Sequence, residues 1–275
     1  MSHDPLVSII VPTRNSATFL RACLESAKNQ TYPHIELIVV DRDSTDTTKQ
    51  IAGDYTSHVY NHGPERSAQR NFGVSKAKGD YVAIIDSDME LTPKVIEACI
   101  GVVTKDSAVR GVIIPEESFG IGFWARCKAL ERSFYVGNDD IEAARFFART
   151  TYDELGGYDT GLVAGEDWDL SARVRATGPI IHIQEFIRHN EGHIRFMDTV
   201  KKKYYYTQHA RAYLAKSDNK ATLTANNGPL QRYKLFFSRP AHLFRHPLVG
   251  LGMLTLKTAE YGFGAAGYYF KKTSK

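Results

Sequence analysis

The sequence predicts an α/β fold: a mostly parallel sheet flanked by helices, with a helical extension at the C-terminal end. Three observations lead to this prediction. Short apolar segments alternate with helical segments through the first half of the 275 residues, as they do in parallel βαβ units. The apolar segments lack a polar face, which suits strands covered by helices on both sides. The hydrophobic content of 43% is that of an ordinary globular core.

The first half of the chain alternates four strands with three helices. The strands are short runs rich in Val and Ile, bounded by turn residues, and they cover residues 6–12, 35–41, 57–63 and 81–86. Helices are expected between them at 15–30, 44–55 and 67–78. The first helix has an apolar face at helical spacing and Asn15 as its N-cap.

The middle of the chain is less regular. A helix with an early proline is expected at 93–104, a strand at 108–116 and a helix at 122–136. Residues 142–149 fit a strand and a helix equally well. Further on we expect a helix at 166–178, one or two short strands within 179–193, and a long helix at 195–216.

A polar segment after residue 216 divides the chain into a predicted α/β domain at 1–216 and an extension at 217–275. The apolar end of the extension, 247–270, is interrupted by Lys257, Glu260 and five glycines, so it predicts an amphipathic segment at a membrane surface and not a membrane-spanning helix. The alternative is a helical hairpin packed on the α/β domain or on the second subunit of a homodimer.

Charge and cysteine content limit the partners and the compartment. The net charge of +4 favours anionic ligands or a membrane surface, but it is too small to indicate nucleic acid. The three cysteines are far apart and suggest neither a disulfide framework nor a zinc site. No secretory signal is visible, so we expect a cytoplasmic location, at the cytoplasmic face of the membrane if the extension binds lipid.

The segment YVAIIDSDMEL contains two aspartates, Asp86 and Asp88, directly after a predicted strand. In an extended chain residues i and i+2 point the same way, and ligands of open α/β sheets bind at the carboxyl ends of the strands. Two carboxylates this close repel each other unless a cation lies between them. Mg²⁺ or Mn²⁺, with a diphosphate completing its coordination, would relieve the repulsion. The alternative is a polar turn that caps the following helix.

A second acidic cluster, GEDWDL, places Glu166, Asp167 and Asp169 at the start of a predicted helix. Acidic residues there favour the helix dipole, which explains one carboxylate better than three. The functional interpretation is a general base close to the metal site.

Four segments together resemble the family-2 glycosyltransferases of the GT-A fold. They are VSIIVPTRN, IELIVVDRDSTDTT, ERSAQRNFGVSKAKGDYVAIIDSDMEL and LGGYDTGLVAGEDWDLSARV, in that order from Val7 to Arg175. The resemblance implies a Rossmann-like, nucleotide-sugar-binding sheet and inverting transfer of a sugar from a UDP- or GDP-sugar to a hydroxyl. The acceptor would be lipid-linked, a glycan or a small molecule. The Gln-x-x-Arg-Trp motif of processive members is missing, which favours a non-processive enzyme.

The resemblance also implies residue roles at the nucleotide. Pro12, Thr13 and Asn15 would line the nucleotide pocket, and Asp41 would contact the base or ribose. Arg66 and Arg70 would approach the nucleotide or its phosphates.

At the reacting groups, Asp86 would lie by the ribose and the metal, and Asp88 would be the direct metal ligand. Asp167 would be the catalytic base, with Glu166 beside it at the nucleotide sugar. A histidine completes the metal site of some GT-A enzymes, and His189 is the candidate here. The alternative is a structural histidine.

A sugar nucleotidylyltransferase is the competing enzyme class, because it also uses an aspartate-rich metal site on a similar sheet. Such enzymes have a Gly-rich, Arg-containing loop after the first strand. This chain reads VPTRNSATFL there, without a glycine.

Overall fold

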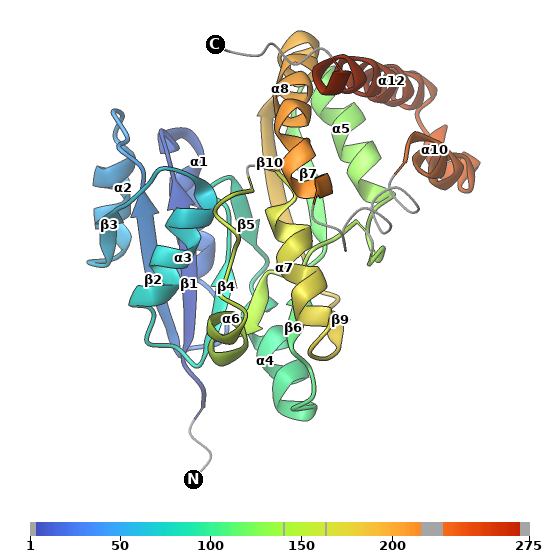
Figure 1. Cartoon of the computed structure of the whole chain (residues 1–275). Coiled ribbons are helices and arrows are strands. Elements are labelled where there is room, and N and C mark those ends of the chain that lie inside the picture. The colour runs from blue at the N-terminus through green and yellow to red at the C-terminus, as the bar shows by residue number, and fades with distance from the viewer. Residues whose placement is uncertain (1–3, 140, 163, 216–227, 270–275) are drawn as a thin grey trace. The chain divides into compact units, whose positions relative to one another are not determined.

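The computed structural model describes residues 4–139, 141–162, 164–215 and 228–269 (Figure 1). The backbone forms two compact units. The first contains residues 1–116, 142–160 and 167–190, and the second contains 117–141, 161–166 and 191–275. The domain boundary predicted after residue 216 falls in a segment outside the described residues, so it stays a prediction.

The first unit is built on a seven-stranded sheet with the order β3-β2-β1-β4-β8-β6-β9. The strands are β1 Val7–Thr13, β2 Ile35–Asp41, β3 Val59–Asn61, β4 Tyr81–Ile84, β6 Gly111–Ile113, β8 Phe146–Ala148 and β9 Ile180–His182. All neighbouring pairs are parallel except those of β8, which is antiparallel to both β4 and β6. This confirms the predicted mostly parallel sheet.

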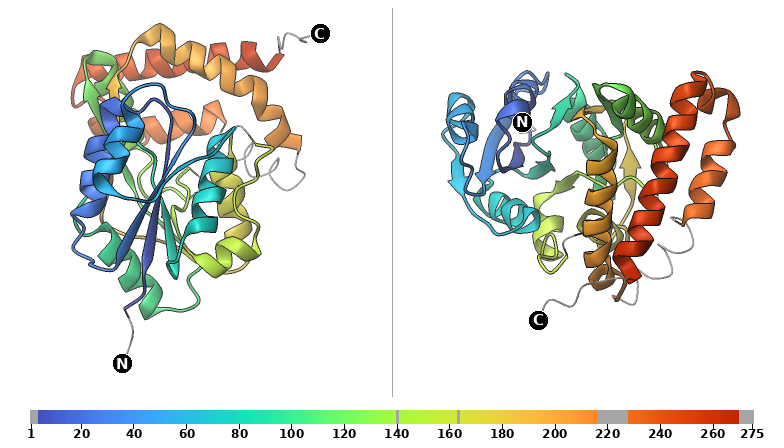
Figure 2. Two further views of the ribbon diagram at one scale, coloured as in Figure 1. Left: turned by 90° about the vertical axis from the view of Figure 1, so that its left-hand side faces the viewer. Right: turned by 90° about the horizontal axis from the view of Figure 1, so that it is seen from above.

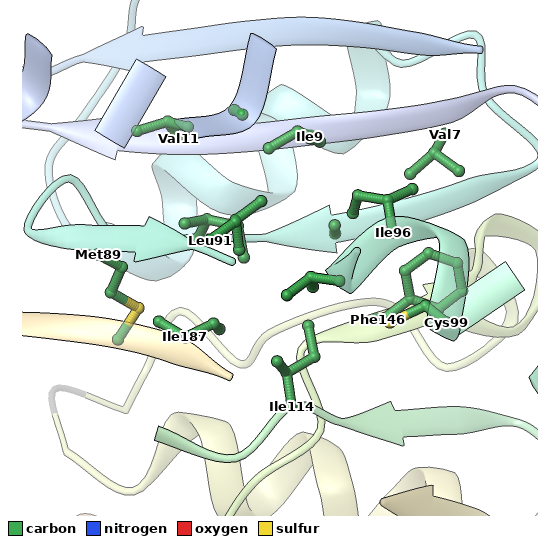
Figure 3. Close-up of a cluster of buried hydrophobic side chains, with 14 of the residues drawn as sticks. Val7, Ile9, Val11, Met89, Leu91, Ile96, Cys99, Ile114, Phe146 and Ile187 are labelled. Carbon is green, nitrogen blue, oxygen red and sulfur yellow. The ribbon is translucent and has the colours of Figure 1, made fainter. Parts of the chain in front are cut away.

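Helices cover both faces of this sheet. The apolar side chains of α1 (Ala17–Lys28), α2 (Thr48–Tyr55) and α4 (Val95–Lys105) form one core with the strands. Those of α3 (Arg66–Lys76), α6 (Arg149–Glu154) and α7 (Glu166–Arg175) form a second core. Figure 3 shows part of the first core, where Ile9 of β1, Ile96 of α4 and Phe146 of β8 are all fully buried.

A second, three-stranded sheet has the order β5-β10-β7, with β5 Met89–Leu91, β10 Ile187–His193 and β7 Glu116–Ile121. β10 runs antiparallel to β5 and places His189 opposite Met89. Met89 and Ile187 pack into the first core (Figure 3). This arrangement brings the start of β10 next to the chain that follows β4.

Several predicted boundaries were wrong for local reasons. Asn15 is not an N-cap: its φ is 49° and α1 begins at Ala17. α2 begins at Thr48 because the residues before it form a loop in which Asp46 accepts the Thr48 N–H at 3.0 Å. The predicted strand 108–116 stops at Ile113, close to Pro115, which has no N–H for a ladder. Residues 142–149, which fit a strand and a helix equally well, contain β8.

The second unit contains α5 (Phe123–Ser133), α8 (Phe196–Ala215), α10 (Pro229–Phe237), α11 (Pro240–Leu243) and α12 (Pro247–Tyr269). α12 packs along α8 and against α5 (Figure 2). Gly252 permits one of these approaches, because a Cβ there would lie 2.5 Å from the Phe123 ring. Within the described ranges, none of the helices combines the length and the hydrophobicity that crossing a membrane requires.

A buried ring of four charges joins α5 to α12. Lys128 Nζ lies 2.9 Å from Glu131 and 3.1 Å from Glu260. Lys257 Nζ lies 2.6 Å from Glu131 and 2.9 Å from Glu260. Each lysine therefore contacts both glutamates. Because removal of one partner would leave a buried charge uncompensated, the ring fixes how α12 lies on α5.

The close packing of α3 on the sheet gives a test of the fold. A Cβ at Gly73 would lie 2.4 Å from Ile10 Cγ2 on β1. Gly73→Ala should therefore destabilise the protein by about 1–2 kcal/mol, because overpacking outweighs the gain in helix propensity. The midpoint of urea unfolding measures the change.

Gly53→Ala in α2 is the matched control, since nothing lies within 4 Å of a Cβ at that position. It should stabilise the protein by about 0.5–1 kcal/mol. Equal stabilisation by both substitutions would show that α3 does not lie this close to β1.

Candidate functional site

The loops after β1 and β2 are tied together at the carboxyl end of the sheet. Asp41, the last residue of β2, is fully buried. Its carboxylate accepts hydrogen bonds from Thr13 Oγ1 at 3.0 Å and from the Ser44 N–H at 2.8 Å. Pro12 lies beside Val40 in the β1–β2 register. Asp41 thus organises the two loops, and its predicted contact with the base or ribose stays a prediction.

Asn15 continues this connection. Its N–H donates to Ser44 Oγ at 2.7 Å, and its side-chain oxygen accepts the Thr45 N–H at 2.9 Å. The left-handed φ of 49° turns the backbone so that both contacts form. The structure therefore brings Pro12, Thr13, Asn15 and Asp41 together where ligands of α/β sheets bind.

Asp86 and Asp88 lie in a turn, contrary to the expectation of an extended strand. β4 ends at Ile84, and the Met89 N–H donates to the Asp86 carbonyl at 3.0 Å. The turn separates the two side chains, so each has its own partners. The expected i, i+2 alignment is therefore not what places them at the site.

Arg70 is the buried centre of the site. Its side chain has 0% exposure. Nη2 donates to Asp86 at 2.7 Å and Nη1 donates to Asp167 at 2.8 Å, while the guanidinium lies 4.8 Å from the centre of the Tyr158 ring. Both contacts are to carboxylates, so the predicted approach of Arg70 to a phosphate would require this group to become exposed.

A loop with two glycines holds Tyr158 against Arg70. Asn71 Oδ1 accepts the Tyr158 N–H at 2.9 Å and the Tyr152 hydroxyl at 2.6 Å. Gly157 has φ 65°, and a Cβ there would lie 2.6 Å from the same Asn71 oxygen. The Gly-Gly-Tyr segment is therefore structural, and it serves the site through Arg70.

Arg145 and Glu116 belong to the site, although neither stands in a recognisable sequence motif. β8 runs antiparallel to β4 and β6, so the residue before β8 lies at the carboxyl ends of its neighbours. Arg145 therefore meets Asp86, which follows β4, at 3.5 Å. It also meets Glu116, which follows β6, at 2.7 Å. A buried strand preceded by arginine is the only signal that the sequence offers.

His189 lies between two carboxylates. Its Nε2 is 3.4 Å from Asp88 Oδ2, and its Nδ1 is 3.3 Å from Glu116 Oε2. The Asn190 N–H donates to the Asp88 carbonyl at 2.8 Å, which holds β10 to the turn. Burial by itself would lower the pKa of His189, but the hydrogen bonds to Asp88 and Glu116 outweigh burial and raise the pKa to about 10.

These contacts form one series of ion pairs, called the ion-pair series below, in which the charges of the side chains alternate in sign. In order, its members are Asp167, Arg70, Asp86, Arg145, Glu116, His189 and Asp88. Burial alone would raise the pKa of Asp86, but Arg70, Arg145 and Arg66 together hold that pKa well below its usual range. The ion-pair series ends in two partly exposed carboxylates. The side chain of Asp167 is 30% exposed and that of Asp88 is 40% exposed.

The donors at Asp88 are few for a divalent cation that protein alone would hold. Among the described residues, no three histidine, cysteine or acidic side chains are arranged to hold a metal ion by themselves. Asp88 and His189 supply two donors on one side of the site. Mg²⁺ and Mn²⁺ commonly use one or two protein ligands and take the others from phosphate and water. The residues therefore fit a cation that a diphosphate helps to hold.

Two predicted residues lie at helix starts. Arg66 is the first residue of α3, and Glu166 is the first residue of α7. Glu166 is buried, with 4% exposure. Their predicted contacts with the nucleotide sugar stay predictions.

Comparison with protein families gives a match over residues 8–154 to the model "Glycosyl transferase family 2". Putative glycosyltransferase EpsH of Bacillus subtilis (strain 168) is 39% identical over 103 residues, covering 34% of this chain and 29% of the relative. Chondroitin synthase of Escherichia coli is 27% identical over 224 residues, covering 74% of this chain and 32% of the relative. The chain thus spans about a third of the length of these curated relatives.

Solved structures give the fold. The mannosyltransferase PcManGT from Pyrobaculum calidifontis, in complex with GDP-Man and Mn²⁺, aligns with a TM-score of 0.60 at 18% identity. The alignment covers 98% of this chain and 89% of that one. S. aureus TarS 1–349 in complex with UDP-GlcNAc aligns with a TM-score of 0.54 at 14% identity, covering 96% and 89%. At these identities the likeness concerns the fold alone, and it agrees with the predicted GT-A architecture.

The family match covers more than half of the chain, from the second residue of β1 to the end of α6. It includes the loops at Asn15 and Asp41, the turn with Asp86 and Asp88, and the two arginines that connect the carboxylates. The chain belongs to glycosyl transferase family 2.

Proposed function

We propose that this protein transfers a sugar, with inversion, from a nucleoside diphosphate sugar to a hydroxyl group. One observation carries the proposal: the ion-pair series links two partly exposed carboxylates, Asp167 and Asp88. The reaction needs two separate acidic functions, one at the acceptor hydroxyl and one at the leaving group. Bound GDP-Man and UDP-GlcNAc in two structures of similar fold support a UDP- or GDP-sugar as donor.

Asp167 is the proposed general base. The acceptor oxygen forms a bond to the anomeric carbon while the bond from that carbon to the diphosphate breaks. The hydroxyl proton passes to the Asp167 carboxylate, and the nucleoside diphosphate leaves with the bonding electrons. Arg70 holds Asp167 at 2.8 Å, which fixes the carboxylate before the acceptor arrives.

Asp88 and His189 are the proposed metal ligands, and Asp86 supports them through its contacts with Arg70 and Arg145. Mn²⁺ or Mg²⁺ would neutralise charge that develops on the departing diphosphate. Of these two cations, we favour Mn²⁺. The Mn²⁺ in the PcManGT complex supports this choice.

The remaining predicted residues would form the donor pocket. Pro12, Thr13, Asn15 and Asp41 lie at the proposed nucleotide end, and Asp86 lies by the ribose. Arg66, Arg70 and Glu166 complete the predicted set. Arg66 is the better candidate for a phosphate contact, because it begins α3 and helix N-termini favour anions.

Asp88→Asn should abolish the part of nucleotide binding that depends on Mn²⁺, since the substitution removes the carboxylate that faces His189. Calorimetry of UDP and GDP binding, with Mn²⁺ and then with EDTA, measures this part. Asp153→Asn, at an exposed position of α6, is the matched control and should bind like wild type. Equal nucleotide affinity of the wild type in Mn²⁺ and in EDTA would contradict the proposed metal site.

Asp167→Asn should leave donor binding nearly unchanged and lower turnover by ~10²–10⁴-fold, the typical effect of losing a general base. The release of nucleoside diphosphate from UDP- and GDP-sugars measures turnover. The thermal unfolding temperature shows whether loss of the Asp167 charge beside the buried Arg70 destabilises the protein. Near wild-type turnover in the variant would place the base elsewhere, with Glu166 and Asp169 next in line.

We further propose that the acceptor is lipid-linked and that the second unit binds the cytoplasmic face of an anionic membrane. Large apolar side chains of α10, of α12 and of the segment between α11 and α12 are exposed. Leu230 is 65% exposed and Leu248 is 75% exposed, and the group also includes Phe237, Phe244 and Leu251. Such a group beside bases suits the boundary between lipid headgroups and acyl chains.

The exposed charges that lie near this apolar group in the sequence are of one sign. The sequence has no Asp or Glu between Asp218 and Glu260, and Glu260 is buried in the ring on α5. Two bases of this region, Arg232 and Lys257, are buried too. The electrostatic attraction thus rests on three exposed bases of the described region: Lys234, Arg239 and Arg245. Each contributes about 1 kcal/mol near an anionic surface.

The protein should sediment with vesicles of equal parts phosphatidylcholine and phosphatidylserine at low salt, and less so at high salt. The double variant Lys234→Glu, Arg245→Glu should stay in the supernatant. Lys105→Glu, an exposed charge reversal on α4, is the control and should sediment like wild type. If the wild-type protein remains in the supernatant at low salt, a soluble acceptor and a protein-bound extension, including a homodimer, become the better hypotheses.

A further inference from the structure

Glu116 uses its two carboxylate oxygens for two different partners. Oε1 accepts hydrogen bonds from Arg145 Nε at 3.0 Å and from Arg145 Nη2 at 2.7 Å. Oε2 lies 3.3 Å from His189 Nδ1. The side chain is 18% exposed and that of Arg145 is 11% exposed. Glu116 is thus held on one side by a guanidinium, while its other oxygen faces the imidazole.

The opposite nitrogen of His189 points to Asp88. Nε2 lies 3.4 Å from Asp88 Oδ2, and β10 carries His189 in ladder register with Met89, the residue after Asp88. The backbone therefore fixes where the ring lies, and Glu116 supplies a partner that fixes which edge of the ring faces Asp88.

We infer that Glu116 is a positioning residue, which binds the His189 Nδ1–H and so directs the Nε2 lone pair toward a cation held by Asp88. Metal-binding histidines generally donate their second N–H to a carboxylate or carbonyl, and this contact sets the tautomer and the ring orientation. Arg145 completes the arrangement, because it occupies Oε1 and leaves Oε2 for the histidine. The inference rests on the proposed function, since it requires Asp88 to be a metal ligand.

Glu116→Gln tests this role, because it removes one acceptor oxygen of the side chain. Glutamate offers two acceptor oxygens, and both are needed, one by Arg145 and one by the His189 N–H. Glutamine keeps only one acceptor, because its other terminal atom is a donor. One of the two contacts must therefore be lost, although the size of the side chain is unchanged. Glu117→Gln is the matched control, because Glu117 is the next residue of β7 and is exposed.

Two measurements on the full-length protein test the inference. Titration with Mn²⁺ in the presence of UDP or GDP, followed by the electron paramagnetic resonance signal of free Mn²⁺, should show affinity lowered about 10–100-fold in Glu116→Gln and unchanged in Glu117→Gln. Electron spin echo modulation from the coordinated imidazole nitrogen should be present in wild type and weakened or lost in Glu116→Gln at saturating Mn²⁺. A role in folding alone would leave this signal intact.

The outcomes separate the two hypotheses. If Asp88→Asn abolishes Mn²⁺ binding while Glu116→Gln keeps both wild-type affinity and the nitrogen signal, the positioning role is wrong and the proposed metal site stands. If Asp88→Asn binds Mn²⁺ like wild type, the proposed metal site itself is wrong. Glu116→Asp, which keeps two acceptor oxygens, should recover more of the affinity than Glu116→Gln, and a glutamine variant with the higher affinity would overturn the inference.

Discussion

The rest of the site depends on the pairing of the buried Arg70 guanidinium with two carboxylates. A buried charge costs several kcal/mol unless it is paired and hydrogen-bonded, and Arg70 has no exposed surface. Asp86 and Asp167 meet this requirement from two different elements, and the Tyr158 ring covers the guanidinium. The same requirement therefore fixes the positions of two carboxylates that are far apart in the sequence. The loop locked by Asn71 serves this arrangement, because it holds Tyr158 in place.

Fixed charges of this kind prepare a site for chemistry before the substrate binds. A site whose charges already point to where new charge develops does not have to reorganise during the reaction. In this protein each member of the ion-pair series between Asp167 and Asp88 is held by a neighbour of opposite charge. The effects of two substitutions within this series on stability or activity should therefore not add, since neighbours in one ionic network share their partners.

The sequence predicted those parts of the fold and site that are encoded locally. The alternation of apolar runs and helical segments identified the sheet, and Asp86, Asp88 and Asp167 stand in short acidic motifs next to predicted strand and helix ends. Arg145 and Glu116 could not be predicted, because their roles depend on the antiparallel pairing of β8 with β4 and β6. No local sequence pattern reveals that pairing. The extended geometry expected for Asp86 and Asp88 was wrong because β4 stops at Ile84 and a turn follows. Lys257 interrupts an apolar run in the sequence, yet it is buried against Glu131, a partner that lies far away in the sequence.

The ring of Lys128, Glu131, Lys257 and Glu260 has a consequence for how this sequence can change during evolution. Loss of any one member leaves an unpaired charge inside the second unit, whereas replacement of all four by apolar residues of similar size can be neutral or even stabilising. Single substitutions at these positions should therefore be rare among related sequences that keep the α5–α12 contact. The four positions should instead vary as a set, either all charged or all apolar, and such covariation would identify the relatives in which α12 lies on α5 in the same way.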